Sequence, residues 1–313
     1  MPLHFLKKIK NIFVKRPKQF HKIENVIWQT GKGITTDFEL QYVRDLLLKN
    51  IQYNAILDNF ECKTILDNSL IIYSNDKKRV PEHFKKYLQQ YDKLGYNYSL
   101  LHLSNERLYH KFSYYKKANH VFRGYYDPRI TLGNVTTIPI GFKSGFLNTE
   151  HTTPTITERN YIWAFIGHIK SDRKEMHDTL LPITPHFTHL TSKWNAPEQL
   201  SVDEIISIYK KTIFVPSPIG WGNPDSFRIN EALEWGCIPI VKKYKNIDYF
   251  KNVYGEHPLL LVDNWAQAHD KVIELCKDLD KLERYRLEIQ EWYAAFKINL
   301  QHKIKTILVG EEA

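Results

Sequence analysis

The sequence predicts an α/β protein with two domains, each built around a parallel sheet. Three observations support this: a length of 313 residues, the alternation of short apolar runs with amphipathic stretches, and an irregular segment near the middle of the chain. A chain of this length fits two domains of about 150 residues each. Short strands that alternate with helices are typical of parallel sheets, because each parallel strand needs a crossover connection.

Residues 23–155 are predicted to form the first domain. It opens with a short apolar run, Val26 to Gln29, and a glycine-containing turn, followed by a helix that Asp37 is placed to cap. A second helix is expected to start at Pro81 and to stop at Gly95. Other runs of strand length follow the same alternation: SLIIYSN, YSLLHLSNE, HVFRGYY and VTTIPIGF.

Residues 143–160 interrupt the pattern. The run KSGFLNTEHTTPTITERN is rich in Thr, Ser, Gly and Pro and has no apolar period, which is typical of a linker. We place the boundary at residue 155 and expect a second domain over residues 156–280. Residues 281–313 are predicted to form a long aromatic helix that packs back on the first domain. The second domain's expected strands and helices are YIWAFIGHI, VDEIISIYKK, TIFVPSP, DSFRINEALEWG, CIPIVKK and WAQAHDKVIELCKDL.

The net charge of +9 is concentrated at the start of the chain. In residues 1–22, lysines and arginines alternate with apolar residues, and no acidic residue is present. This pattern predicts a basic amphipathic segment that lies on an anionic membrane surface. The alternative is a solvated helix with one buried face. No run approaches the roughly 20 apolar residues that span a bilayer.

The three cysteines, Cys62, Cys237 and Cys276, are far apart and lack the spacing of a zinc site. We therefore expect reduced thiols in a cytoplasmic protein, peripheral at the inner face of a membrane. A basic protein rich in tyrosine could bind nucleic acid, but no stretch matches a nucleic-acid-reading motif, so no nucleic-acid partner is expected.

The most informative stretch runs from residue 212 to residue 242. It combines an apolar run, a loop with Gly220 and Gly222, a short helix and a second apolar run. In an open parallel sheet, such loops and the helix N-termini after them form the ligand crevice, which suits a diphosphate. Arg228 could neutralise that diphosphate, and Glu231 could accept hydrogen bonds from ribose hydroxyls. The alternative is an ion pair on the helix surface.

This stretch resembles the exostosin-like glycosyltransferases. The family's run Ser-Phe-Arg, two residues, Glu-Ala-Leu, two residues, Gly-Cys-Ile-Pro stands here at residues 226–239, after a Pro-x-Gly type loop at Pro218 and Gly220. The segment FIGHIKSDRKEM is similar to the family's Phe-x-Gly loop followed by an arginine. The resemblance extends over residues 24–300 and is strong over residues 160–245. The chain is shorter than usual for the family, which leaves the acceptor-side loops in question.

The resemblance implies a GT-B fold, in which two Rossmann-like domains face a central cleft, and an inverting, metal-independent transfer of sugar from a nucleotide sugar to a glycan or glycolipid. A uridine diphosphate donor is expected, with UDP-xylose slightly ahead of other sugars. The residues expected to bind the donor come from the two matching segments: Gly167, Lys170, Arg173, Ser217, Gly220, Gly222, Ser226, Phe227, Arg228 and Glu231. The alternative is an inactive carbohydrate-binding or accessory subunit that keeps the fold.

An inverting transfer needs a general base, on the side of the sugar opposite the leaving diphosphate. In a two-domain enzyme this base should come from the first domain. The candidates are Glu106, then Asp127, then His102. Each could instead be a cap or turn residue. The fourteen histidines are scattered, so no metal and no other cofactor is expected.

Overall fold

The computed structural model describes residues 22–29, 36–58, 61–74, 81–109, 112–150, 152–170, 172–193, 196–220 and 222–310. The predictions for the basic segment at residues 1–21 and for the Asp37 side chain lie outside this part of the chain. Within the described residues, no helix combines the length and apolarity needed to cross a membrane.

The first sheet is entirely parallel, with strand order β2-β1-β3-β4-β5-β6. Every residue of β1, β3 and β4 is buried, as expected for central strands covered on both faces. The sequence analysis missed β2, an edge strand whose residues are mostly exposed. The strands are β1 (Asn25–Gln29), β2 (Asn54–Leu57), β3 (Ser69–Tyr73), β4 (Tyr98–His102), β5 (Val121–Arg123) and β6 (Val135–Thr137).

The helices of the first half agree with their sequence signals. Helix α2 (Glu82–Leu94) begins after Pro81 and ends at Gly95, whose φ of 69° lies in the left-handed region. The expected first helix divides into α1 (Thr36–Gln41) and the π-helical segment η1 (Tyr42–Leu47). A 3-10 turn, η2, covers Ser113–Lys116.

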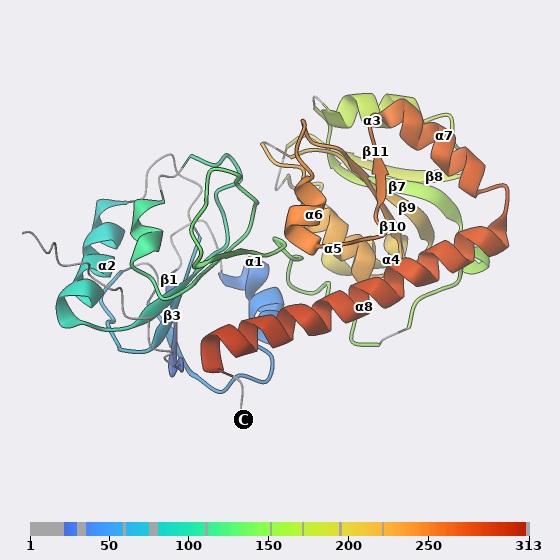
Figure 1. The fold of residues 1–313 in the computed structure, drawn as a ribbon. Coiled ribbons are helices and arrows are strands. Elements are labelled where there is room, and N and C mark those ends of the chain that lie inside the picture. Colours follow the sequence, from blue (N-terminus) through green and yellow to red (C-terminus); the bar gives the residue numbers. More distant parts are fainter. Residues whose placement is uncertain are drawn as a thin grey trace, which may run out of the picture.

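The second sheet is also parallel, with strand order β11-β10-β9-β7-β8. Its strands are β7 (Tyr161–His168), β8 (His186–Thr191), β9 (Thr212–Ser217), β10 (Ile238–Lys242) and β11 (Leu260–Val262). Its helices are α3 (Asp172–Leu180), α4 (Val202–Tyr209), α5 (Phe227–Glu234), α6 (Tyr249–Tyr254) and α7 (Trp265–Leu275). Figure 1 shows the two sheets in separate lobes, with α1 where the lobes approach each other.

The segment between the sheets is irregular, as predicted, apart from the short turn η3 (Ile156–Glu158). It is nevertheless packed, because Phe146 and Ile156 are buried. The amide of Asn148 donates to the carbonyl of Glu234 at 3.0 Å. The segment therefore lies against α5 and does not behave as a solvated tether.

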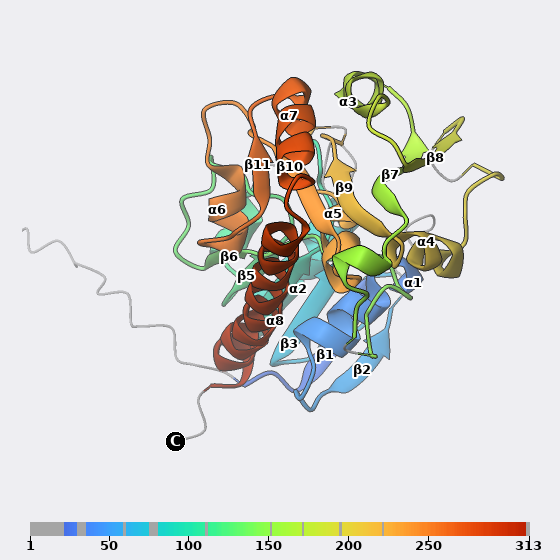
Figure 2. The ribbon, with the colours of Figure 1, turned by 90° about the vertical axis from the view of Figure 1, so that its right-hand side faces the viewer.

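Helix α8 (Leu279–Val309) joins the two lobes. It starts beside the second sheet and ends beneath the first, as Figures 1 and 2 show. Near its end, Leu300, Ile304 and Leu308 enter the hydrophobic core of the first sheet. The Leu308 carbonyl also accepts a hydrogen bond from the Ile23 amide at 2.8 Å. The predicted return of the C-terminal helix to the first domain is thus confirmed.

Candidate functional site

Helix α5 starts where the second lobe contacts the first. Its inward face is the expected one, because Ile229, Ala232 and Leu233 are all buried. At its first residue, the ring of Phe227 meets the ring of Phe38 on α1, with centroids 5.0 Å apart. The N-terminus of the helix that carries the sequence motif therefore touches the first lobe.

Arg228 points toward the carboxyl end of β7. Its Nη2 donates to the Ile166 carbonyl at 3.0 Å, and its guanidinium lies 4.8 Å from the centre of the Phe165 ring. Gly167 makes this approach possible: its φ is +143°, and a Cβ there would stand 3.2 Å from the Arg228 Nη2. The structure thus brings the two predicted motifs into contact.

Two further predicted cations lie at the same place. Arg173 donates to the His168 carbonyl at 3.2 Å, and its buried Nε has no partner among the described residues. Burial, and then the positive charge of Arg228, lower the pKa of Arg173 to about 10. Burial and Arg173 also lower the pKa of Lys170. A cluster of crowded cations with an unused N–H group would be stabilised by an anion.

Asp172, which the sequence analysis did not single out, ties this cluster to the glycine loop. Its carboxylate accepts hydrogen bonds from the Ile219 amide at 2.9 Å and from the Trp265 indole at 3.0 Å. It also pairs with the Lys242 ammonium. Asp172 therefore fixes the start of α3 against the end of β9 and against β10. A lone Asp in a polar helix gives no sequence signal for such a role.

Glu106 comes from the first lobe and lies against the glycine loop of the second. A Cβ at Gly220 would collide with the Glu106 Oε1, and a Cβ at Gly222 would stand 3.2 Å from the Glu106 carbonyl oxygen. The amide of Asn223 donates to that same carbonyl. The negative charge of Glu106 acts on both Arg173 and Lys170. Glu106 therefore sits on the cation cluster.

Glu231 is half-buried one turn further along α5. Its Oε1 accepts a long hydrogen bond, 3.4 Å, from the Lys143 amide. Burial raises the pKa of Glu231 to about 7, against the opposing charges of Arg228 and Lys143. The sequence also predicts that two serines bind the donor. Ser217 is buried at the end of β9, and the Ser226 Oγ is buried with no partner among the described residues.

The other two candidate bases lie outside the cation cluster. His102 is fully buried, with its ring stacked 4.3 Å from that of Tyr73 and its Nδ1 2.6 Å from the Tyr115 hydroxyl. The Asp127 carboxylate accepts two hydrogen bonds from the Arg129 guanidinium, at 2.8 and 2.6 Å. Among the interactions of the described residues, no hydrogen bond or ion pair joins His102 or Asp127 to Arg228 or Arg173.

No three His, Cys, Asp or Glu side chains of the described residues form a group that could hold a metal ion. The sequence contains an Asp-x-Asp run at Asp278 and Asp280, a pattern associated with metal binding in other glycosyltransferases. Asp278, however, caps α8 by accepting the Lys281 amide at 2.9 Å. The expectation of a metal-independent reaction stays a prediction.

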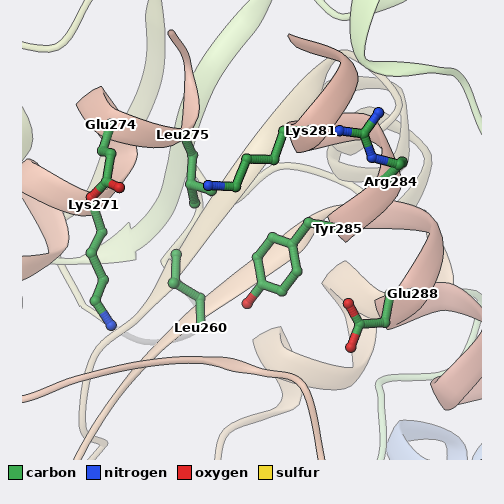
Figure 3. A pocket seen from close by; sticks show the side chains of 8 residues that line it. All are labelled: Leu260, Lys271, Glu274, Leu275, Lys281, Arg284, Tyr285 and Glu288. Atoms are coloured by element: carbon green, nitrogen blue, oxygen red, sulfur yellow. The ribbon is translucent and has the colours of Figure 1, made fainter. Parts of the chain in front are cut away.

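A pocket of about 430 Å³ lies away from this site. Figure 3 shows it lined from α7, from β11 and from the start of α8, with Tyr285 near its centre. The Tyr285 hydroxyl donates to the Pro258 carbonyl at 2.8 Å. None of the predicted donor or catalytic residues lines this pocket, so it has no part in the site described above.

A family model described as the RXYLT1 C-terminal domain matches residues 144–311. This match covers the segment between the sheets, the whole second sheet and α8. No curated protein matches the chain.

Solved structures match nearly the whole chain at low identity. An α1,3-fucosyltransferase is 12% identical, with a TM-score of 0.55, and 93% of this chain and 92% of that chain are covered. Anabaena Alr3699/HepE, in complex with UDP and glucose, is 10% identical with a TM-score of 0.54, covering 91% of this chain and 99% of that one. A glycosyltransferase from Rickettsia africae is 11% identical with a TM-score of 0.52, at the same coverage. Together with the two parallel sheets, these likenesses confirm the predicted GT-B fold.

Proposed function

The chain belongs to the RXYLT1 C-terminal domain family and is a glycosyltransferase, and from that premise we propose that α5 and the cation cluster bind the diphosphate and ribose of a nucleotide-sugar donor. The observation that carries this proposal is the convergence of Arg228, Arg173 and Lys170 beside Gly167. The positive charge of Arg228 lowers the pKa of Arg173, whose buried Nε has no partner among the described residues, so a diphosphate would complete the site.

Each part of the donor has a proposed contact. The diphosphate lies between Arg228 and Arg173, with the backbone N–H groups of the loop at Gly220 and Gly222. Glu231 accepts hydrogen bonds from the ribose hydroxyls. The same arginines stabilise the diphosphate as it leaves, which is the work a metal ion does in other transferases. We propose on this ground that the reaction is metal-independent, and that it inverts the anomeric carbon in one step.

We propose uridine diphosphate as the nucleotide, which the complex of Anabaena Alr3699/HepE with UDP and glucose supports at the level of fold. UDP-xylose is the first donor to test. The acceptor is proposed to be a glycan or glycolipid, used in the cytoplasm at a membrane surface. The resemblance to the exostosin-like enzymes stays a prediction, as does the absence of a nucleic-acid partner.

The test is a panel of nucleotide sugars, measured by thermal shift and by release of the nucleoside diphosphate, with and without chelator. We expect one UDP-sugar to stabilise the protein and to be turned over equally well in chelator. Replacing Glu231 by alanine (Glu231→Ala) removes charge-assisted hydrogen bonds worth about 1.5 to 3 kcal/mol each, so UDP affinity should fall at least about tenfold.

Glu291→Ala, on the exposed face of α8, is the matched control and should change nothing. Turnover that persists in Glu231→Ala would show that the donor site is elsewhere. A protein that binds UDP-sugars but turns none of them over, with any acceptor, would instead be the accessory subunit.

A further inference from the structure

A tight turn after β4 brings Glu106 from the first lobe to the second. The turn is built on Asn105, which is fully buried and has a φ of 92°, a conformation that Asn tolerates better than most residues. The Asn105 carbonyl accepts the Leu108 amide at 2.9 Å, and its Oδ1 accepts the Tyr109 amide at 3.0 Å. The backbone on either side of Glu106 is therefore fixed.

The glycine loop that Glu106 meets is held by the second lobe alone. The Ile219 amide donates to the Asp172 carboxylate at 2.9 Å, at the start of α3. The Gly222 carbonyl accepts the Tyr244 hydroxyl at 2.9 Å, from the segment after β10. The loop therefore has its own supports, and its shape does not depend on the Glu106 carboxylate.

The Glu106 carboxylate fills the space that Gly220 leaves by having no side chain. A Cβ at Gly220 would collide with the Glu106 Oε1. The backbone of Glu106 has a separate contact, because its carbonyl accepts the Asn223 side-chain amide. The half-buried carboxylate can thus turn away about the bonds of its own side chain while both backbones stay in place.

In this position Glu106 is a counter-ion of the cation cluster. Burial and then the charge of Arg228 lower the pKa of Arg173, and the negative charge of Glu106 opposes this effect. Glu106 also opposes the lowering of the Lys170 pKa. Asp172 acts on Arg173 as well, but it pairs with Lys242.

The diphosphate of the proposed donor needs the same cations and the same loop. It is expected between Arg228 and Arg173, against the N–H groups at Gly220 and Gly222. A carboxylate and a diphosphate repel each other, and in a half-buried site water screens this repulsion only in part. The two anions are therefore competitors for one place.

We propose that the Glu106 carboxylate gates the donor site: it occupies the diphosphate position, moves out when the donor binds, and returns as the nucleoside diphosphate leaves. The proposal rests on the donor site at α5. The gate lowers the affinity for the product and so limits product inhibition. A general base, the role expected from the sequence, would instead lie across the sugar from the diphosphate.

The experiment compares Glu106→Gln with the wild-type protein by calorimetry. Glutamine keeps the size of the side chain and removes its charge. We expect UDP and inorganic pyrophosphate each to bind about tenfold more tightly to the variant, and uridine, which has no phosphate, to gain nothing. Glu82→Gln on α2, an exposed glutamate paired with Lys85, makes the same change in net charge and should leave all three affinities unchanged.

Thermal unfolding gives a second readout. Without nucleotide, Glu106→Gln should unfold at a lower temperature than the wild type, because the cations lose a counter-ion. UDP at one fixed concentration should then stabilise the variant by more than it stabilises the wild type, because the tighter ligand has the higher occupancy.

An unchanged UDP affinity in Glu106→Gln would overturn the gate, and if turnover of the UDP-sugar were lost at the same time, Glu106 would be the general base. Weaker UDP binding would also overturn it, because Glu106 would then hold the donor or support the loop. A wild type that binds no nucleotide would end the proposed function itself.

Discussion

Two carboxyl groups with raised pKa values flank the start of α5, and their partners distinguish them. Asp225 accepts the Ile140 amide at 3.2 Å and the Tyr254 hydroxyl at 3.4 Å, and burial raises its pKa to about 7. Glu231 has the same raised pKa but a single long hydrogen bond, from the Lys143 amide, among the described residues. Glu231 can therefore accept further hydrogen bonds from a ligand. The hydrogen bond of Asp225 with the Ile140 amide instead links the second lobe to the first.

This difference gives the donor site a pH dependence. Glu231 accepts two ribose hydroxyls only when it is ionised, so donor affinity should be highest above about pH 7 and should weaken by up to about tenfold for each pH unit below it. The measurement is the Kd of UDP-glucose between pH 5.5 and 8.5, in buffers of about constant ionic strength.

Glu231→Gln provides the comparison, because it keeps the shape and loses the titration. Asp225 and Glu39 still titrate in this variant, so any pH dependence that remains belongs to groups other than Glu231. A pH dependence of equal size in both proteins would show that Glu231 does not bind the ribose.

At the scale of elements, the carboxyl end of β7 lies in close contact with α5 through Arg228. Gly167 at φ +143° lets the Arg228 guanidinium reach the Ile166 carbonyl, while Asp172 anchors the next helix. We expect Gly167→Ala to strain the backbone by about 1 to 3 kcal/mol and to displace Arg228. UDP affinity should therefore fall about tenfold or more, as measured by calorimetry.

Gly133→Ala is the matched control, since a Cβ at Gly133 has no neighbour within 4 Å. This variant should bind UDP as the wild type does. If Gly167→Ala loses stability but keeps its UDP affinity, the contact between Arg228 and β7 has no role in holding the diphosphate.

The elements that could be predicted from the sequence are those with a strong apolar pattern or a strong cap. Strands β1, β3 and β9 are wholly buried, β7 has a buried centre, and α2 has Pro81 and Gly95 at its ends. Strand β2 was missed because its exposed residues show no apolar run. Helix α6 was missed because it is only six residues long, too short for a helical period to show.

The site divides in the same way. Arg228 and Glu231 stand in a local run with fixed spacing, so the sequence could mark them. Asp172 lies at the start of a polar helix, where an aspartate normally faces solvent. Its contacts with Ile219, Trp265 and Lys242, all far away in the chain, give it a place beside the glycine loop. Local pattern carries no information about such a contact.

At the scale of the molecule, α8 is the element that connects both cores. Leu282, Ile289 and Tyr293 belong to the core of the second sheet, whereas Ile304 and Leu308 belong to that of the first. Between the two groups, the Lys297 ammonium pairs with the buried Glu234 of α5 at 2.9 Å. The position of one lobe relative to the other is therefore set partly by this helix.

The role of α8 in holding the lobes together can be tested by replacing isoleucine with alanine at two positions of the helix, Ile304 and Ile298. Ile304 is 2% exposed and contacts the first core, whereas Ile298 is 65% exposed. Ile304→Ala should lower the free energy of unfolding by about 2 to 5 kcal/mol, and Ile298→Ala by no more than about 0.5 kcal/mol. Because α5 stays packed in the second core, Ile304→Ala should keep its affinity for UDP at temperatures well below unfolding, while its turnover falls as the first lobe loses its fixed position. Equal effects of the two substitutions in urea unfolding, or unchanged turnover in a destabilised Ile304→Ala protein, would show that α8 does not hold the lobes in register.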